Sequence, residues 1–235
     1  MNTKYAQYLL NKTKEDYNRI AQVFNKTRNY IPPDLEILKT YVQPGDRVLD
    51  LGCGNGRLYE IMQGMTDYYG ADVSEKIIEI AREKYPKAKF FITDPLSLPF
   101  EDNFFDKVFC LSVFHHIPSQ RFRLKFLKEI NRVLKPDRVL ILTVWNLWPK
   151  KKIRHLLFKY TLLKLIGKSR LGFFDIMLPW KNGQGETIIN RYIHVFRRGE
   201  LNKLLKKAGF KVQEVKIIKR SKKESNIFVL AKKVS

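Results

Sequence analysis

The sequence predicts an α/β fold in which an open, mostly parallel sheet carries helices on both of its faces. From Arg47 onward, short apolar runs alternate with amphipathic helical patterns, which is the order that βαβ units produce. Three glycines follow the first apolar run, and acidic residues stand at the ends of the next two. We expect one domain over residues 1–235, with 1–40 as an N-terminal helical cap and 146–190 as a basic insertion or substrate lid.

The N-terminal segment predicts two helices. Apolar side chains at spacings of three and four residues favour an amphipathic helix over 4–25, and Pro32-Pro33 separates it from a short helix over 34–41. The first residues are polar and contain neither an apolar signal core nor a cleavage site. No apolar stretch of the sequence reaches the roughly 18 uncharged residues that a membrane span needs. Both observations predict a cytoplasmic protein.

Five strands and three helices should then alternate. The strands are expected at 47–51, 67–72, 88–93, 105–112 and 138–145. Helices are expected from the glycines to Met62, over 75–84 behind Ser74 as N-cap, and near 119–134. After 146–190, a helix over 198–208 ends at Gly209, and strands over 211–219 and 226–232 are joined by the turn RSKKES. These two strands form the final pair.

Charge is distributed unevenly along the chain. There are 45 Lys and Arg against 23 Asp and Glu, for a net charge of +22. Residues 1–145 hold 22 basic and 18 acidic residues (+4), whereas residues 146–235 hold 23 and 5 (+18). A general abundance of lysine would explain the composition but not this asymmetry. We therefore expect cofactor chemistry in the first part and capture of a polyanion, above all nucleic acid, by the second.

Cysteine and histidine indicate neither a disulfide framework nor a metal site. Cys53 and Cys110 fall in or beside apolar runs, so both are expected to be small buried hydrophobic residues. Four histidines lack metal-ligand spacing with any cysteine or carboxylate cluster, namely His115, His116, His155 and His194. No bound metal is therefore expected.

The glycine run Gly52-Cys-Gly-Asn-Gly56 follows the first strand and precedes a helix. Glycine lets the backbone turn sharply and approach a bulky ligand, and the helix start offers unpaired N–H groups. Dinucleotide-binding proteins place a pyrophosphate there with the spacing G-x-G-x-x-G. Here the spacing is D-x-G-x-G-x-G, and Asp50 would repel a pyrophosphate but would suit the cationic methionine moiety of S-adenosylmethionine. The residues thus favour this cofactor over NAD.

Polar residues end the following strands at the same edge of the sheet. Asp72 ends the second strand, where a carboxylate can accept both hydrogen bonds of a ribose diol. Asp94 ends the third, where a carboxylate can meet the exocyclic amine of adenine, and His116 follows the fourth. Either carboxylate alone would be an ordinary N-cap or loop residue, but their order at the ends of successive strands indicates one binding site.

Five segments within about residues 40–145 together resemble the class I S-adenosylmethionine-dependent methyltransferases: VLDLGCGNGR, GADVS, ITDPLSLPF, FDKVFCLSVFHHI and LKEINRVLKPDRVLIL. The resemblance implies a Rossmann-like, seven-stranded methyltransferase sheet whose last strand runs antiparallel. It also implies that S-adenosyl-L-methionine is held by Asp50, Gly52, Cys53, Gly54, Gly56, Asp72, Val73, Asp94, Pro95, Leu96, Leu111 and His116.

Three further features resemble one subfamily: the segment YNRIAQVFNKTR at 17–28, the pair His115-His116 with Val144-Trp145, and RYIHVFRRGEL at 191–201. The subfamily is that of the tRNA wobble-uridine carboxymethyl methyltransferases, which includes the methyltransferase part of the eukaryotic AlkB-type tRNA hydroxylase. Ile193 departs from it, because the family has an aromatic residue there. The resemblance implies esterification of 5-carboxymethyluridine, with catalytic candidates Arg28, His116, Trp145, Arg191, Tyr192 and His194.

The chemistry of such an acceptor fits these residue types. A carboxylate is already anionic at pH 7, so catalysis needs positioning and exclusion of water rather than a strong base. Arg28 and Arg191 are candidates to hold the carboxylate or a phosphate through bidentate contacts. The other four could stack on or orient a flipped base, although one of the strand residues Tyr192 and His194 is expected to be core packing. The basic insertion and C-terminal third would grip phosphates of the anticodon stem.

Other interpretations stay open. The segment KKIRHLLFKYTLLKLIGK also fits a basic amphipathic helix on a membrane surface, which would suit a small-molecule or lipid-quinone methyltransferase. A further alternative is an RNA-binding protein without catalytic activity. The intact set of predicted cofactor residues argues against it. For eukaryotic members, the resemblance implies a small zinc-binding activator subunit as partner.

Overall fold

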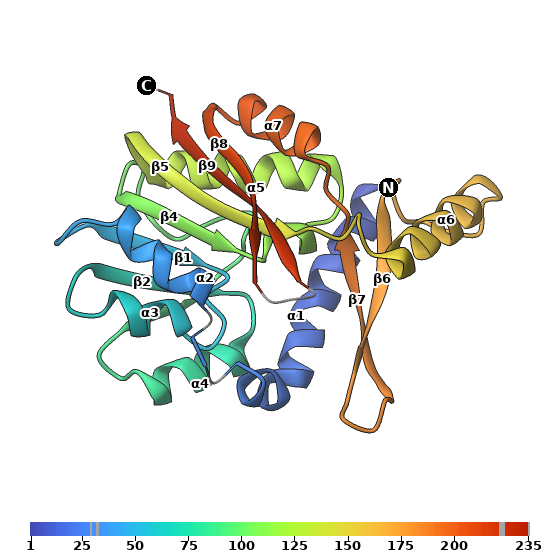
Figure 1. Cartoon of the computed structure of the whole chain (residues 1–235), viewed down its shortest axis with the longest axis horizontal. Helices are drawn as coiled ribbons and strands as arrows, with labels where there is room; N and C mark the ends of the chain where they lie inside the picture. Colours follow the sequence, from blue (N-terminus) through green and yellow to red (C-terminus); the bar gives the residue numbers. More distant parts are fainter. Residues whose placement is uncertain (29, 32, 221–223, 235) are drawn as a thin grey trace.

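The computed structural model describes residues 1–28, 30–31, 33–220 and 224–234, without the side chains of residues 33 and 34. Its centre is a seven-stranded sheet in the order β3-β2-β1-β4-β5-β9-β8 (Figure 1). The five parallel strands are β1 (Arg47–Leu51), β2 (Asp67–Asp72), β3 (Lys89–Ile92), β4 (Phe105–Leu111) and β5 (Leu134–Trp145). β9 (Ser225–Lys233) pairs antiparallel with both β5 and β8 (Phe210–Lys219), which confirms the predicted α/β class and the antiparallel last strand.

Helices cover both faces of this sheet. One apolar layer receives α5 (Gln120–Val133) and α7 (Arg198–Lys207), with Phe126 and Leu205 fully buried in it. The other receives α3 (Arg57–Met62), α4 (Glu75–Lys84) and the 3-10 turn η1 (Ile37–Tyr41) that follows α2 (Pro33–Glu36). The central strands β1 and β4 are therefore buried on both sides, which explains why they read as nearly continuous apolar runs.

Most element boundaries agree with those expected from the sequence. Ser74 and Ser119 cap α4 and α5, since each side chain accepts a hydrogen bond from the backbone N–H three residues later. β5 begins at Leu134, earlier than the expected residue 138, because the chain passes from α5 directly into the strand. Residues 221–223 of the predicted turn RSKKES, and Pro32 of the predicted break, lie outside the described residues.

The segment after β5 forms α6 (Lys151–Leu165) and an antiparallel hairpin of β6 (Asp175–Lys181) and β7 (Thr187–His194). The hairpin is a separate two-stranded sheet that lies beside α1 (Thr3–Lys26) (Figure 1). Leu9 of α1 packs against Tyr192 on one face of the hairpin, and Ile153 of α6 packs against Ile193 on the other. The sequence indicated a strand-like run in β7 but not its partner β6.

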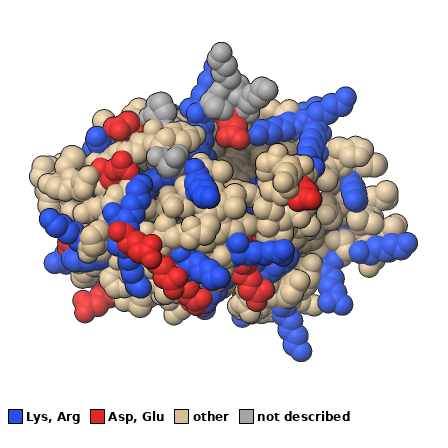
Figure 2. Space-filling view, turned by 90° about the horizontal axis from the view of Figure 1, so that it is seen from below, with Lys and Arg blue, Asp and Glu red and all other residues tan. Residues whose placement is uncertain are grey.

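The surface reflects the charge asymmetry of the sequence. Figure 2 views the molecule from the lower side of Figure 1. At its right-hand end, where β6, β7 and α6 lie in Figure 1, the charged side chains are mostly Lys and Arg. α6 also exposes the apolar side chains of Phe158, Leu162 and Leu165. Within the described ranges, no helix is long and apolar enough to cross a membrane.

Candidate active site

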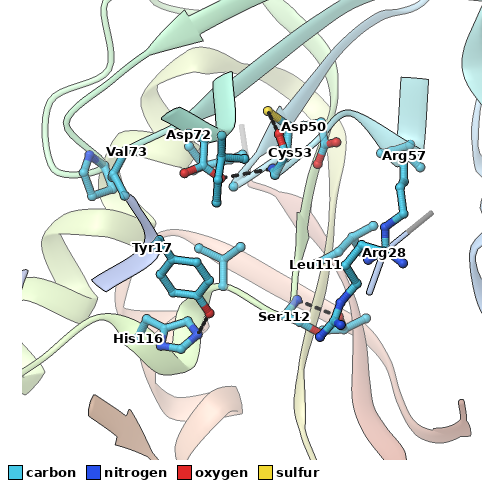
Figure 3. A pocket seen from close by; sticks show the side chains of 18 of the residues that line it. Tyr17, Arg28, Asp50, Cys53, Arg57, Asp72, Val73, Leu111, Ser112 and His116 are labelled. Atoms are coloured by element: carbon cyan, nitrogen blue, oxygen red, sulfur yellow. Dashed lines mark hydrogen bonds between the residues drawn. The ribbon is translucent and has the colours of Figure 1, made fainter. Parts of the chain in front are cut away.

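A cavity opens at the carboxyl ends of β1, β2 and β4, the edge at which open α/β sheets bind their ligands (Figure 3). Side chains of α1 and of the β6–β7 hairpin complete its wall. The predicted site residues that line it are Arg28, Asp50, Gly52, Cys53, Gly54, Asp72, Val73, Pro95, Leu111, His116, Trp145 and Arg191. α1 and the β6–β7 hairpin are more than a hundred residues apart in the sequence. Both nevertheless contribute side chains to the wall of this one cavity.

The glycine run needs glycine for steric reasons. Gly52 has a φ of 81°, and a Cβ on it would lie 2.1 Å from Cγ2 of Val113. Gly54 has a φ of 56°, and its backbone N–H donates a hydrogen bond of 3.0 Å to Oδ2 of Asp72. The loop therefore passes close to the following strand ends and leaves its backbone facing the cavity.

Asp50 is a buried carboxylate in the cavity wall, with 3% of its surface exposed. The Tyr68 hydroxyl donates a hydrogen bond of 2.7 Å to its Oδ2. Burial raises the pKa of Asp50 to about 7 and the nearby Asp72 carboxylate adds to the rise, whereas the Tyr68 hydrogen bond and the Arg57 cation oppose it. A cation beside this carboxylate would stabilise the charged form of Asp50.

Asp72 accepts two backbone hydrogen bonds at the end of β2. Its Oδ2 accepts from Gly54 N–H and its Oδ1 from Ser74 N–H, each at 3.0 Å. Burial raises the pKa of Asp72, and these backbone donors work in the opposite direction. Each carboxylate oxygen keeps a second lone pair, as acceptance from a ribose diol requires. Asp50 and Asp72 place two carboxylates in the cavity wall, so the residues present fit a cationic, ribose-containing cofactor such as S-adenosyl-L-methionine.

The cavity also contains a basic cluster. Arg28, Arg191 and Arg220 all line the cavity, and the ring of Trp180 of β6 contacts two of them. The guanidinium carbon of Arg28 is 5.6 Å from the centroid of the Trp180 ring, and that of Arg191 is 4.7 Å from it. Burial lowers the pKa of Arg28, and the like charges of Arg220 and Arg191 lower it further. Such a cluster of cationic side chains can receive an anion through charge-assisted hydrogen bonds.

His116 and Tyr17 form a fixed part of the wall. Nδ1 of His116 lies 3.1 Å from the backbone carbonyl oxygen of Tyr192, so this nitrogen carries the proton. Nε2 is then an acceptor, and the Tyr17 hydroxyl donates to it across 3.0 Å (Figure 3). Burial lowers the pKa of His116 to about 3, and the Arg191 cation contributes to the decrease. His116 is therefore neutral, with its one lone pair occupied.

Tyr192 and His194 do not line this cavity, although the sequence made both catalytic candidates and expected only one of them to be core packing. The Tyr192 hydroxyl donates to Oδ1 of Asp175 at 2.7 Å, behind the wall. His194 contacts the same oxygen with Nδ1 at 2.6 Å and Oε1 of Glu200 with Nε2 at 2.8 Å. Both side chains point to the face of β7 opposite that of Arg191, because neighbouring strand residues alternate between faces.

Three predicted cofactor residues also lie outside the lining. Gly56 is the left-handed N-cap of α3, and a Cβ on it would lie 2.9 Å from atoms of Phe90 and Tyr85. Asp94 is exposed, and its Oδ1 accepts a hydrogen bond from Leu96 N–H. Leu96 itself is part of the apolar core. These residues shape the loops that carry the cavity rather than forming its wall.

The two cysteines are buried free thiols, as expected, although Cys53 also lines the cavity. Burial raises the pKa of Cys53 well above its ordinary value, so its thiol stays protonated. In the part of the chain that the structure describes, no group of three or more His, Cys, Asp or Glu side chains could hold a metal ion.

Sequence reasoning missed Tyr17, Trp180 and Arg220, all of which line the cavity. Tyr17 opens the segment that resembles the tRNA methyltransferases, so its place in that motif was an available signal. Trp180 and Arg220 lie in a strand and a turn whose positions depend on pairing with distant segments. No local pattern marks either of them.

Known proteins match this chain over its central strands and beyond. The family model described as "Methyltransferase domain" matches residues 49–142. The chain is 29% identical over 216 residues to the tRNA (carboxymethyluridine(34)-5-O)-methyltransferase of Schizosaccharomyces pombe, covering 84% of this chain and 88% of that one. It is 31% identical over 206 residues to an uncharacterized protein of Methanocaldococcus jannaschii, covering 85% and 76%. It spans only about a third of the length of the plant and animal relatives that it matches.

Solved structures share the fold. An S-adenosylmethionine-dependent methyltransferase from Methanosarcina mazei has a TM-score of 0.71 at 24% identity, covering 84% of this chain and 97% of that one. The complex of the Haloferax volcanii Trm112 methyltransferase activator with a methyltransferase gives a TM-score of 0.67 at 16% identity, covering 95% and 98%. The shared fold, the domain match and the sequence relatives agree with a cavity whose carboxylates fit this cofactor. The chain belongs to the S-adenosylmethionine-dependent methyltransferases.

Proposed function

We propose that this methyltransferase esterifies the carboxylate of a 5-carboxymethyl group on the wobble uridine of tRNA. The observation that carries the proposal is that one cavity holds two carboxylates, Asp50 and Asp72, and an arginine cluster in which Arg28 and Arg191 contact Trp180. A cationic cofactor matches the carboxylates, and an anionic acceptor matches the arginines. The similarity to the Schizosaccharomyces pombe enzyme of that name supports the same acceptor.

Arg28 and Arg191 are the proposed holders of the acceptor carboxylate. The Trp180 ring contacts both guanidinium groups and limits their movement. Nη1 of Arg28 donates to Thr27, which leaves the other N–H groups of Arg28 for an acceptor. Nε of Arg191 has no hydrogen-bond partner among the described residues although it is buried. A carboxylate between the two side chains would receive charge-assisted hydrogen bonds and fix one oxygen toward the cofactor.

The proposed reaction requires little acid–base catalysis from the protein. S-adenosyl-L-methionine, when bound, supplies a methyl group on a positively charged sulfur. The acceptor carboxylate is ionised at pH 7, so its oxygen needs no base and the product is a methyl ester. His116 already accepts the Tyr17 hydrogen bond with Nε2, so its role is to hold α1 against the wall. The residues of the cavity orient the carboxylate and exclude water.

The uridine ring needs a platform once it leaves the anticodon stack. The Trp145 ring lines the cavity and is held by His115, with ring centroids 4.4 Å apart. Trp145 is the proposed platform, because an indole face can stack on an unstacked base, whereas the Trp180 ring already contacts two guanidinium groups. Tyr192 and His194 act as positioning residues, since they support the wall from behind rather than touch the base.

The remaining segments have roles in the same scheme. Residues 1–40 act as a helical cap and 146–190 as a basic insertion that supplies Trp180, while the strongly basic residues 146–235 hold RNA phosphates. The similarity to the methyltransferase solved with an activator supports a small activator subunit as partner. Zinc in that subunit, contact of α6 with a membrane surface, and a cytoplasmic location stay predictions.

The test is incubation of the purified protein with methyl-labelled cofactor and bulk tRNA, followed by nucleoside analysis. We expect a methyl ester of carboxymethyluridine that mild base releases. The matched variants are Arg191→Gln, in the cavity, and Arg198→Gln, exposed at the start of α7, and only the first should lose ester formation. A base-stable methyl group on a base or ribose would refute the carboxylate acceptor. Label that enters small molecules or lipids but not tRNA would favour the alternative methyltransferase.

A further inference from the structure

A second pocket lies where α1, α5 and α7 begin, and it shares no lining residue with the active-site cavity. We call it the helix-start pocket, and its lining includes Arg121, Arg123, Asp175, His194, Glu200 and Lys203. His194 reaches it from the face of β7 opposite that of Arg191. A ligand in this pocket would therefore bind outside the catalytic cavity.

Arg123 is the central cation of the helix-start pocket. Only 5% of its surface is exposed, and its Nε and Nη1 have no hydrogen-bond partner among the described residues. Its guanidinium carbon lies 5.6 Å from the centroid of the Phe196 ring, which limits its orientation. Its ion pair with Asp175 is long, at 3.9 Å between Nη1 and Oδ1. Buried cationic donors without partners are unfavourable, and an anion in the pocket would satisfy them.

The acidic residues of the pocket already have hydrogen-bond partners within the protein. Asp175 accepts hydrogen bonds from the Tyr192 hydroxyl and from His194, and Glu200 accepts from the other ring nitrogen of His194. Although burial raises the pKa of each carboxyl, the hydrogen bond and charge of His194 and the charge of Arg123 hold both below their usual values. Both carboxylates thus contact His194 at hydrogen-bond distance, whereas Arg123 reaches Asp175 only at 3.9 Å.

Three helices point their N-terminal ends at the pocket. Residues at the starts of α1, α5 and α7, which have 24, 14 and 10 residues, all belong to its lining. The first N–H groups of a helix have no partner within the helix, and the helix dipole places partial positive charge there. Side-chain caps satisfy one such N–H each on α1 and α5, whereas the N-cap of α7, Arg197, makes no side-chain hydrogen bond. Convergent helix starts with a buried arginine favour a phosphate.

Exposed cationic side chains lie at the rim of the pocket. Arg121 of α5 and Lys203 and Lys207 of α7 are exposed, and each lines the pocket. None of the three forms an ion pair with an acidic side chain in the described part of the chain. A phosphate held by Arg123 would meet these side chains at the pocket mouth.

We propose that the helix-start pocket binds a phosphate group, supplied by the RNA backbone at a point away from the methylated base. The assignment to RNA rests on the proposed function, whereas the assignment to phosphate rests on the pocket alone. A backbone phosphate contact of this kind sets the register of the RNA without reading its sequence.

The test compares two double variants that each remove two charges from the same two helices. Arg121→Ala with Lys203→Ala removes charge from the rim, and Lys128→Ala with Lys206→Ala removes exposed charge outside the pocket. Fluorescence anisotropy with a labelled anticodon stem-loop gives Kd at several salt concentrations. We expect the rim variant to lower the slope of log Kd against log salt by about 1 and to weaken binding about tenfold, with a much smaller change in the control.

A second arm separates the two sources of phosphate. Thermal unfolding is measured with and without inorganic phosphate at constant ionic strength, for the wild type, both double variants and Arg123→Gln. Stabilisation by phosphate that the pocket variants lose and the control keeps supports the site. If RNA binding is unchanged while this stabilisation is lost, the ligand is a free phosphate. If neither RNA binding nor phosphate stabilisation depends on the pocket residues, the proposal is overturned.

Neither arm requires methyl transfer. Failure of tRNA to accept label would therefore contradict the proposed function and leave the result for the pocket intact. Conversely, normal ester formation with an unchanged salt slope and no phosphate stabilisation would contradict only the pocket.

Discussion

The Tyr17 hydroxyl donates a hydrogen bond to Nε2 of His116, and this contact fixes the N-terminal helix to the turn after β4. It occupies the lone pair that a catalytic histidine would use as a base. Together with the donation from Nδ1 to the Tyr192 carbonyl, it leaves His116 with two satisfied ring nitrogens. The geometry thus indicates that His116 positions the cavity wall and does not transfer a proton.

His116→Asn should reduce kcat by less than about tenfold, because loss of a general base would reduce it by about 100-fold or more. The pKa of His116 is lowered to about 3, so kcat at saturating cofactor and tRNA should not change with pH through histidine ionisation between pH 6 and 8. Steady-state kinetics across this range test both points. A loss of several hundredfold, or a kcat that falls with an apparent pKa between 6 and 7, would show that His116 is a base.

The coupling between Tyr17 and His116 is also measurable. Tyr17→Phe removes the donor and leaves a buried acceptor without a partner, which should lower the free energy of unfolding by about 1 kcal/mol. A double-mutant cycle with His116→Asn should give a coupling energy of about 0.5 to 1.5 kcal/mol in chemical denaturation. Additive single and double variants would contradict the contact.

Cofactor affinity should depend on the ionisation of Asp50. Burial raises its pKa to about 7, and a bound cation favours the charged form, so affinity rises with pH and levels off above about pH 7. Below that value, each pH unit should weaken binding by up to about tenfold. Isothermal titration with S-adenosylhomocysteine, whose ammonium group keeps the charge, measures this between pH 5.5 and 8.5. In Asp50→Asn the pH dependence should disappear and the affinity should be low at every pH.

The same carboxyl should destabilise the protein that lacks cofactor. A carboxyl whose pKa is raised by folding favours the folded state when protonated, so its contribution is present below pH 3.8 and is lost as pH rises through 7. In Asp50→Asn the side chain does not ionise, so stability is not lost as pH rises. The amide oxygen of Asn can still accept the hydrogen bond from the Tyr68 hydroxyl. The free energy of unfolding of this variant at pH 8 should exceed that of the wild type by on the order of 2 kcal/mol. A variant that is less stable than the wild type at pH 8, measured without cofactor, would disprove the raised pKa.

Trp180 should matter for the acceptor and not for the cofactor. Trp180→Ala removes the ring that contacts Arg28 and Arg191, and two cation–π contacts of about 0.5 to 1 kcal/mol each correspond to a KM for tRNA raised about tenfold. Phe104→Ala is the matched control, because Phe104 stacks with Arg47 and neither residue lines either pocket. Equal effects of the two variants on the KM for tRNA, or an effect of Trp180→Ala on cofactor affinity, would argue against the proposed acceptor site.

The sequence predicted the sheet and the two carboxylates of the cavity because both depend on local patterns. Apolar strands, a glycine turn that follows Asp50 and a carboxylate at Asp72 lie close together in the chain, and parallel strands bring their carboxyl ends to one edge. The arginine cluster depends on pairing between distant segments. Arg191 and Trp180 meet only because β6 and β7 form a hairpin. His194, three residues from Arg191, faces the other side, so one motif supplies residues to two different pockets.

The opposed charges of the cavity are tested most directly by two matched stem-loop RNAs. One carries 5-carboxymethyluridine at the wobble position, and the other carries the uncharged amide, 5-carbamoylmethyluridine, in the same sequence. Single-turnover methyl transfer is measured for both at saturating cofactor. The pairing of the carboxylates Asp50 and Asp72 with the arginines Arg28 and Arg191 in one cavity predicts a base-labile methyl ester on the acid and no transfer to the amide. Methylation of both RNAs at similar rates, or of neither, would contradict it.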